Sequence, residues 1–537
     1  MSTSGGPVPA LDADLIERLR SDLVTADWTA ARLGELLSAD AAAALSREQR
    51  IPALVELEGS DDPAATLTRF FILGSVEEAP RLDAALATLT SAGLVALGLA
   101  QPLDGEEASS DEGDAPSRMR ALVDLRPHAA AVGDEDADTT WWIASDQGEA
   151  ITGRPLASDH VMGVGGASAS LLRATMRRRV ARALDLGCGC GIQSLALATH
   201  ADHVVATDLS ARACAFTIFN AALNSVSLDV RQGSLFEPVE GENFDLIVSN
   251  PPFVITPDSV RSSRGTGMLE YRDAGMNRDR LVEIIIRTAP AMLAPGGCLQ
   301  MLANWEIPEG VDPDFEWSQR IDEWFDGLPV DAWVVQRDVL DPARYVEMWT
   351  RDSGVGLVGR DAYERTYRTW LADFRAAGVG AIGMGLITMR TPAVAEGATG
   401  EDNGVRVYDY AITGIAPRGL DVERALAALR LPNDLWDSRL IRADDVIEER
   451  HYVPGSADPT VLILHQGAGL GKSIVVSSAT AAVVGASDGE LTVGQIVSAV
   501  AMLTDRRVDE VKEEVGPALR ELLRAGMMSI AAGEAAS

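Results

Sequence analysis

The stretch Ala183-Leu-Asp-Leu-Gly-Cys-Gly-Cys-Gly-Ile192 decides how the middle of this 537-residue chain is expected to fold. It begins as an apolar run typical of a buried strand and continues into a loop with glycine at every second position, ahead of a helical pattern from Gln193. Glycine adopts the left-handed backbone conformations that tight turns need, and it lets a ligand approach the main chain closely. The stretch therefore predicts a strand, a ligand-binding loop and a helix.

Strands and helices continue to alternate beyond this unit. The apolar runs at 202–209 and 244–250 each precede a helical pattern, one beginning at Ala211 and the other at Arg280. Two later β-rich runs, DAWVVQRD and AIGMGLITMR, are expected to close the same sheet. Such alternation is the signature of a mostly parallel sheet covered by helices on both faces. We therefore expect an α/β fold for the centre of the chain.

The spacing of the glycines distinguishes between two cofactor classes. The nicotinamide fingerprint GxGxxG needs glycine or alanine at its last position, but that position holds Ile192 or Ser194, depending on which glycine begins the motif. The spacing is instead D-x-G-x-G-x-G, with Asp185 closing the strand. Asp208 closes the next strand, where a carboxylate can accept both hydroxyls of a ribose; capping the following helix is its alternative role.

A second motif, Ile247-Val-Ser-Asn-Pro-Pro-Phe253, ends a later strand with an amide, two prolines and an aromatic ring. The side-chain oxygen of Asn250 and the carbonyl oxygen of Pro251 can accept the two hydrogens of a planar –NH₂ group, while the prolines restrict the backbone. Phe253 can stack on a flat amide or base. Both hydrogen bonds would draw the nitrogen towards a pyramidal state whose lone pair can attack a methyl group. A simple turn after a strand is the alternative.

These motifs together resemble those of class I S-adenosylmethionine-dependent methyltransferases, specifically the small-domain family with an NPPF motif that modifies a release-factor glutamine or an rRNA guanine amino group. The resemblance covers residues 159–390 and implies a seven-stranded Rossmann-like core with S-adenosylmethionine as cofactor and without a metal. The catalytic residues that it implies are Asn250, Pro251 and Phe253. The cofactor-binding residues that it implies are Asp185, Gly187, Gly189, Gly191, Asp208, Leu209, Ser234, Leu235 and Asn250.

Two stretches qualify the resemblance. The family commonly has an acid that contacts the adenine amino group where this chain has Ser234, so adenine recognition is left to Ser234, backbone groups or a neighbour. Ahead of the first strand, Asp159-His-Val-Met-Gly-Val-Gly-Gly-Ala-Ser168 is similar to the family segment that folds over the cofactor. An ordinary loop at a helix start is the alternative for that segment.

Charge bears on the substrate. The chain has 46 Lys and Arg against 80 Asp and Glu, a net charge of −34, which repels a polyanion over long range. A protein glutamine is therefore preferred slightly over an rRNA base as the methyl acceptor. The base remains the alternative, because the loop after the second motif carries several arginines, among them Arg261, Arg264 and Arg272. A non-catalytic binding protein that keeps the cofactor fold is a further alternative.

Composition also bears on location and metal content. No apolar run approaches the roughly 18 residues needed to cross a bilayer, and the N-terminus lacks the basic start of a secretion signal. The four cysteines form no CxxC pair, so neither a zinc site nor a disulfide framework is indicated. We expect a cytoplasmic protein without a membrane anchor or a metal.

Changes in composition predict the domain boundaries, which are 1–103 for a mainly helical N-terminal domain, 104–118 for an acidic linker, 119–392 for the methyltransferase domain with a β lead-in, 393–404 for a second linker, and 405–537 for a C-terminal α+β domain. The stretches 81–97 and 515–530 share a pattern in which a helix ends in Ala-Gly and enters a strand. That pattern predicts either a winged-helix module at each end or an ordinary helix end.

A phosphate-loop interpretation of Gly467-Ala-Gly-Leu-Gly-Lys-Ser473 is rejected. The motif GxxxxGK requires glycine one residue earlier, where the chain has Gln466, and the residues that follow are β-branched. A β-hairpin with a glycine-rich turn is expected instead.

Overall fold

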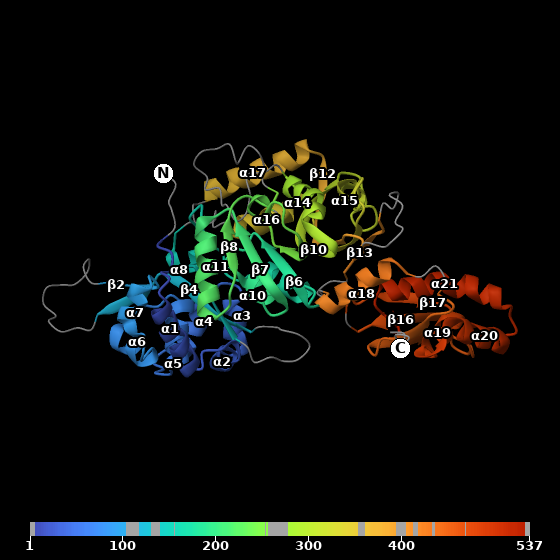
Figure 1. The fold of residues 1–537 in the computed structure, drawn as a ribbon, viewed down its shortest axis with the longest axis horizontal. Coiled ribbons are helices and arrows are strands. Elements are labelled where there is room, and N and C mark those ends of the chain that lie inside the picture. The colour runs from blue at the N-terminus through green and yellow to red at the C-terminus, as the bar shows by residue number, and fades with distance from the viewer. Residues whose placement is uncertain are drawn as a thin grey trace.

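The computed structural model describes residues 6–103, 117–129, 140–154, 156–252, 254–255, 278–352, 360–393, 404–411, 417–431, 435–467 and 469–531. At its centre lies one large sheet (Figure 1). In spatial order its strands are β13 (Arg406–Tyr410), β11 (Asp331–Leu340), β12 (Val379–Arg390), β10 (Leu293–Pro308), β9 (Phe244–Ser249), β6 (Val180–Leu186), β7 (Ala201–Asp208) and β8 (Asp229–Gln232).

The order of the strands positions the candidate site. Strands β8, β7, β6, β9 and β10 run parallel, whereas β12 is antiparallel to both β10 and β11. In register, Leu186 of β6 pairs with Thr207 of β7 on one side and with Ser249 of β9 on the other. Because parallel strands end at one edge of the sheet, the loops after these three strands lie together. The expected α/β class is confirmed, with a mixed sheet.

The expectation of seven strands is wrong, because β13 adds an eighth by pairing in parallel with β11. Its sequence, RVYDY, is short, contains two charged residues, and follows the second predicted linker. An edge strand of this kind has no apolar run to mark it in the sequence. It occupies the open backbone edge of β11, which would otherwise be available for pairing with another chain.

Helices cover the sheet where the sequence predicted them. The pattern from Gln193 is helix α10 (Ile192–Leu197), and those from Ala211 and Arg280 are α11 (Ala211–Leu223) and α14 (Arg280–Thr288). The hydroxyl oxygen of Ser210 caps α11 by accepting from the backbone N–H of Ala213. The remaining helices of this region are α9 (Gly166–Ala174), η2 (Glu237–Val239), η3 (Ala289–Met292), α15 (Gln319–Trp324), α16 (Pro342–Asp352) and α17 (Arg360–Ala376).

The N-terminal part shares its hydrophobic core with the central domain (Figure 1). Buried Trp28, Phe70 and Phe71 belong to the same cluster as Phe216 and Phe219 of α11. The elements of this part are α1 (Ala13–Thr25), α2 (Ala30–Leu36), α3 (Ala39–Leu45), α4 (Ile51–Glu56), α5 (Pro63–Leu67), the π-helical turn η1 (Thr68–Ile72), β1 (Glu77–Glu78), α6 (Ala79–Ala85), α7 (Thr90–Ala96), β2 (Ala100–Pro102), β3 (Arg118–Ala121), β4 (Val123–Ala129), β5 (Thr140–Asp146) and α8 (Glu149–Thr152).

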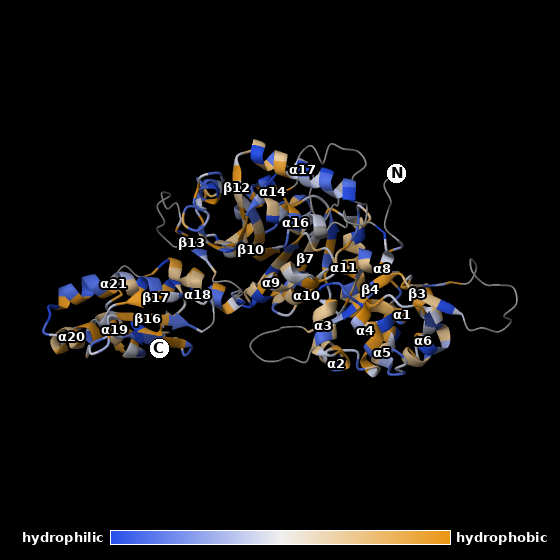
Figure 2. Cartoon of the chain, turned by 180° about the vertical axis from the view of Figure 1, so that it is seen from behind, coloured by the Kyte–Doolittle hydropathy of each residue, from blue (hydrophilic) through white to orange (hydrophobic). Residues whose placement is uncertain are grey.

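The C-terminal part has a hydrophobic core of its own. It is joined to the central sheet through α18 (Gly419–Leu429), whose Val422 and Leu426 pack in a cluster with Leu302 and Trp333. Figure 2 shows α21 banded with hydrophilic residues, whereas the strands of the central sheet are mostly hydrophobic. The other elements are β14 (Arg439–Arg442), β15 (Val446–His451), β16 (Val461–Gln466), β17 (Ser473–Val476), α19 (Ser478–Gly485), β18 (Asp488–Thr492), α20 (Val493–Leu503), α21 (Val508–Arg524) and β19 (Met528–Ile530).

The two ends differ in how well they follow the shared sequence pattern. At the C-terminus α21 ends before Gly526, which has φ 73°, and β19 follows, as expected. At the N-terminus Gly93 lies inside α7, and the turn into β2 is made at Gly98 with φ 71°. Both flanks combine helices with small sheets. The winged-helix assignment stays a prediction.

Three further expectations concern the glycine-rich hairpin, membrane spans, and disulfide or metal sites. Strands β16 and β17 pair antiparallel around the glycine-rich turn, which confirms the predicted hairpin. In the described part of the chain, no helix is long and apolar enough to span a membrane. The four cysteines are free and buried, and no cluster of potential metal ligands occurs among the described residues.

Candidate functional site

The glycine loop between β6 and α10 has the backbone conformation that its sequence predicted. Gly187, Gly189 and Gly191 all have positive φ, at 81°, 54° and 83°. A Cβ atom on Gly187 or Gly189 would meet no atom within 4 Å, whereas one on Gly191 would lie 3.0 Å from the Thr217 side chain. Residues other than glycine would therefore be strained at all three positions, and the first two face open space.

Asp208 ends β7 beside this loop and fastens it. One carboxylate oxygen accepts from the backbone N–H of Gly189 at 2.9 Å, and the other accepts from that of Ser210 at 2.8 Å. Burial raises the pKa of Asp208, and the backbone donors counteract that rise. Each oxygen retains a second lone pair, so the carboxylate can still accept two ribose hydroxyls.

Asp185 lies behind the loop and does not line the cavity described below. It is 0% exposed, and one of its oxygens accepts from the Ser194 hydroxyl at 2.5 Å. The other oxygen is buried without a partner among the described residues. Burial raises its pKa to about 7, with a further contribution from the nearby Asp208 carboxylate. A buried acceptor of this kind calls for a donor or a cation from a ligand or water.

The loop after β8 completes this end of the site. The backbone N–H of Gly233 donates to the Asp208 carbonyl oxygen at 2.9 Å, which brings Ser234 and Leu235 alongside β7. Leu235 has φ 47°, an uncommon conformation for a leucine. Leu209 is 58% exposed. An exposed leucine at such a place can cover a flat ligand such as a purine base.

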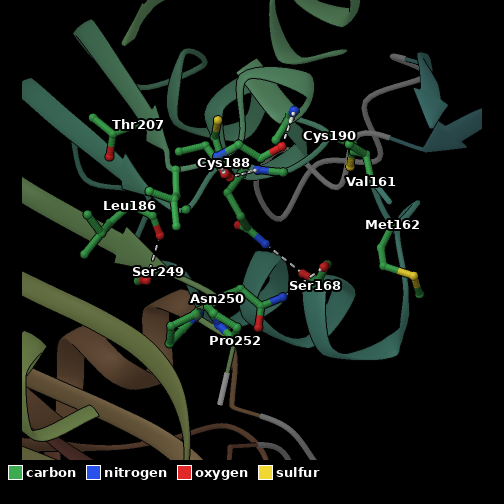
Figure 3. Close-up of a pocket in the computed structure, with 18 of the residues that line it drawn as sticks. Val161, Met162, Ser168, Leu186, Cys188, Cys190, Thr207, Ser249, Asn250 and Pro252 are labelled. Atoms are coloured by element: carbon green, nitrogen blue, oxygen red, sulfur yellow. Dashed lines mark hydrogen bonds between the residues drawn. The ribbon is translucent and has the colours of Figure 1, made fainter. Parts of the chain in front are cut away.

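One cavity of roughly 320 Å³ joins these loops to the end of β9 (Figure 3). Of the residues predicted to bind the cofactor, seven line it, namely Gly187, Gly189, Asp208, Leu209, Ser234, Leu235 and Asn250, whereas Asp185 and Gly191 do not. The segment 159–168 lines it as well, through Val161, Met162 and Ser168 among others. The structure therefore brings together the sequence-distant loops and the segment expected to cover them.

Asn250 is held at the end of β9 with its amide oxygen free. Its Nδ2 donates to the Ser168 hydroxyl at 3.1 Å, while its Oδ1 is buried without a partner among the described residues. Pro251 and Pro252 also line the cavity. Phe253 and most of the arginine-rich loop predicted to meet a substrate (Arg261, Arg264, Tyr271, Arg272 and Asp273) lie outside the described residues. Of the two described members of that loop, Arg278 pairs with Glu306 and Asp373, and Arg280 begins α14. Asn250, with its partnerless acceptor oxygen, therefore lines the same cavity as the glycine loop.

Comparisons with known proteins agree with this geometry. Residues 163–263 match the family model described as "Methyltransferase small domain". The chain contains a methyltransferase small domain. S-adenosylmethionine is the methyl donor of that family, so the family and the cofactor expected from the sequence are confirmed over these residues. Residues 25–110 match a separate model, a domain of unknown function (DUF7059).

Curated relatives share this domain but only part of their length. A release factor glutamine methyltransferase from Geobacter sulfurreducens is 37% identical over 129 residues, covering 22% of this chain and 44% of that protein. A ribosomal RNA small subunit methyltransferase C from Alcanivorax borkumensis is 32% identical over 127 residues, covering 24% and 33%. Among solved structures, a Pyrococcus furiosus methyltransferase is 14% identical with a TM-score of 0.24, covering 41% and 80%. The chain thus spans less than half the length of these two curated relatives.

The methyltransferase domain also contains site residues that the sequence analysis missed. Gln193 donates from Nε2 to the Ser168 carbonyl oxygen at 2.8 Å, and its own oxygen is buried without a partner among the described residues. Near the prolines, the cavity is lined by Val254, Leu281, Ile285 and Trp349. Gln193 follows directly on the glycine loop, so its position was a usable signal. The apolar residues resemble ordinary core positions, and no signal marks them.

Trp349 comes from a helical hairpin, α16 and α17, that is inserted between β11 and β12. Tyr345 of α16 fixes this hairpin to the end of the second motif, because its hydroxyl accepts from the backbone N–H of Ile255 at 3.0 Å and from Asn304 Nδ2 at 2.9 Å. Ile255 and Tyr345 pack in one buried cluster with Trp370 and other residues of the hairpin. The inserted hairpin therefore supplies an aromatic wall to the cavity.

Proposed function

We propose that this chain is an S-adenosylmethionine-dependent N-methyltransferase that methylates a planar amino nitrogen on a macromolecule, preferably a protein glutamine. The observation that carries the proposal is the buried, unpartnered Oδ1 of Asn250, a residue that lines the same cavity as the glycine loop. A buried acceptor without a partner is costly, so its retention fits a role in binding a donor from the substrate. A planar –NH₂ group is such a donor.

The residues of the cofactor end suit S-adenosylmethionine. Gly187 and Gly189 leave open space beside the backbone, and Asp208 retains free lone pairs for a ribose. Asp185 and Gln193 each have a buried oxygen that lacks a partner among the described residues. When bound, S-adenosylmethionine supplies an electrophilic methyl group on a cationic sulfur. Gln193 lines the cavity, so its partnerless oxygen is an acceptor for an ammonium group.

Asn250 and Pro251 would orient the acceptor nitrogen. The Asn250 oxygen and the Pro251 carbonyl oxygen accept its two hydrogens, so that its lone pair points at the methyl group. In this orientation the nitrogen would take up the methyl group that the cofactor supplies, with the sulfur keeping the bonding electron pair, and would release one of its own protons to solvent. Ser168 keeps the amide of Asn250 in the required orientation through the 3.1 Å hydrogen bond. Catalysis then consists of positioning and electrostatics, without a covalent intermediate.

Charge around the cavity supports a protein glutamine over an rRNA base. The acidic residues that line the cavity in the described part of the chain are Asp159 and Asp208, and no lysine or arginine is described there. Burial also lowers the pKa of His160, which keeps that lining residue neutral at pH 7. Together with the net charge of −34, this lining disfavours a phosphate backbone and tolerates an uncharged amide.

Methyl transfer from radiolabelled S-adenosylmethionine tests the proposal. Purified chain is incubated in parallel with release factors and with ribosomal RNA, and the label is then located by protease and by nuclease digestion. We expect protease-sensitive label that maps to a glutamine. Label in RNA alone would replace the glutamine by a base amino group, and binding of S-adenosylhomocysteine without any transfer would favour the non-catalytic alternative.

A further inference from the structure

The covering segment of the cavity is attached to β5, which lies outside the methyltransferase small domain. Asp146, the last residue of β5, donates its backbone N–H to the Val161 carbonyl oxygen at 3.1 Å. In return, the Val161 N–H donates to Asp146 Oδ2 at 2.9 Å. Val161 and its neighbour Met162 line the cavity (Figure 3). One residue thus holds the covering segment by both its backbone and its side chain.

The same carboxylate binds the helix that follows Asp208. Arg212, in the first turn of α11, donates from Nε to Asp146 Oδ2 at 2.8 Å and from Nη2 to Asp146 Oδ1. Its Nη1 donates to the Gly6 carbonyl oxygen near the N-terminus. The side chains of Asp146 and Arg212 are 11% and 8% exposed, so solvent screens this pair little. Asp146 therefore connects the covering segment, α11 and β5.

Strand β5 is itself held by hydrogen bonds to the end of α11 on one side and to the N-terminal part on the other. Asn224 accepts from the Trp142 N–H at 2.9 Å and donates to the Trp142 carbonyl oxygen at 2.8 Å. One helical turn earlier, Asn220 makes the same pair of bonds to Ala144, at 2.8 and 2.9 Å. These two side chains act as a neighbouring strand for β5. On the other side, the Trp142 indole donates to the Trp28 carbonyl oxygen at 2.8 Å.

Asn220 also connects β5 to the glycine loop. Its Nδ2 donates to the Cys190 carbonyl oxygen at 2.8 Å, so the loop and β5 share one buried amide. The N-terminal helices, β5, α11, the covering segment and the glycine loop therefore form a single hydrogen-bonded unit. Displacing β5 would disturb two walls of the cavity.

We propose that Asp146 is a positioning residue through which the N-terminal domain completes the cofactor site. On this view the domain of unknown function, with the β4–β5 hairpin packed on it, holds residues 159–163 over the cofactor. Without the Asp146 carboxylate, the covering segment loses its side-chain anchor, and the cofactor must order that segment when it binds. Such an ordering cost lowers affinity rather than the rate of the chemical step.

Substitution of Asp146 by Asn, matched with Glu77→Gln, tests this proposal. The asparagine amide keeps one acceptor oxygen but replaces the other by an NH₂ group. That NH₂ group cannot accept the hydrogen bond that Val161 or Arg212 donates at this position. Glu77 forms a comparably buried pair with Arg69 at 2.8 Å in the N-terminal domain, where it does not contact the covering segment. Calorimetric titration of each full-length variant with S-adenosylhomocysteine should give a Kd raised about tenfold for Asp146→Asn, the factor for one charge-assisted hydrogen bond, and unchanged for Glu77→Gln.

A second measurement separates local loosening from general destabilisation. Hydrogen exchange of the Val161 amide should accelerate in Asp146→Asn and stay at the wild-type rate in Glu77→Gln, well below the melting temperature of either variant. Equal Kd values for Asp146→Asn and the wild type, or an equal loss in both variants, would overturn the positioning role.

The inference rests on the proposed function only in that the cavity must bind the cofactor. If the wild-type chain fails to bind S-adenosylhomocysteine, the proposed function itself is wrong. If the wild type binds and Asp146→Asn binds equally well, the positioning role alone is wrong. With saturating cofactor, the kcat of Asp146→Asn should be near the wild-type value, because the part of the cavity around Asn250 is unaltered.

Discussion

The two ends of the cavity are built in different ways. The cofactor end comes from loops that follow β6, β7 and β8, and its contacts are fixed by glycine backbone and by the Asp208 carboxylate. The acceptor end comes from distant elements, with apolar walls from Ile285 and Trp349 around the Asn250 oxygen. The difference implies a division of labour, in which the first end determines affinity for the cofactor and the second determines transfer and choice of acceptor. Each substitution below is expected to affect one end and spare the other.

The largest effect is expected from Asn250→Ala. Loss of the amide oxygen removes one of the two acceptors that orient the nitrogen, so kcat should fall roughly 10²- to 10³-fold, the range for removing one preorganised electrostatic contact. The Kd for S-adenosylhomocysteine should change little. Ser168→Ala, which keeps the amide but removes its hydrogen-bond partner, is the graded control and should lose less activity. An unchanged transfer rate in Asn250→Ala would contradict the mechanism.

The next largest effect belongs to the cofactor end. Asp208→Asn leaves an amide where two backbone donors and the ribose hydroxyls require a carboxylate, so the Kd for S-adenosylhomocysteine should rise about 10- to 100-fold. Calorimetry measures it. With saturating cofactor, kcat should be nearly preserved. Asp202→Asn is the matched control on the same strand, because Asp202 pairs with Arg179 at an exposed position. A large loss of kcat with normal affinity would contradict the division between the two ends.

A smaller effect is expected from Trp349→Ala. Removing the indole takes away an apolar wall of the acceptor end, so the KM for the methyl acceptor should rise roughly threefold to tenfold, in the range for lost stacking on one planar group. Steady-state kinetics with the identified acceptor measures this change. Trp349→Phe retains a flat ring and should recover most of the loss. A weakened cofactor affinity with an unchanged KM for the acceptor would assign Trp349 to the cofactor end of the cavity and so contradict its place at the acceptor end.

The same contrast explains what the sequence could predict. The cofactor end was found because its residues lie next to strand ends and carry local signals, such as the alternating glycines before Ile192 and the acid at 208. Helices α10, α11 and α14 were also found, since their apolar periodicity follows directly on those strands. At this end of the cavity, residues that are close together in the sequence are thus also close together in space.

The acceptor end could be predicted only in part. Asn250 and Pro251 carry a chemical signal, but Trp349 lies in PARYVEMWTRD, which reads as any amphipathic helix. Its contact with the cavity depends on how the inserted hairpin packs against Ile255, a long-range arrangement without a local pattern. For the same reason β13 was missed, because its pairing with β11 is decided by an open sheet edge and not by its own composition.

The smallest effect concerns Asp185 and the pH dependence of stability. Burial gives its carboxyl a pKa of about 7 in the folded chain, against the ordinary aspartate value of 3.8, so the folded state retains a proton that the unfolded chain releases. The contribution of this group to the free energy of unfolding is therefore fully favourable below the lower pKa and declines as pH rises towards 7. Asp185→Asn, which is neutral throughout, should remove that decline, and urea denaturation at a series of pH values from 4 to 8 measures it.

A bound ammonium group would favour the ionised form of Asp185, so saturating S-adenosylhomocysteine should diminish the same pH dependence in the wild-type chain. Identical pH profiles for the wild type and Asp185→Asn would show that the carboxyl does not retain its proton behind the loop.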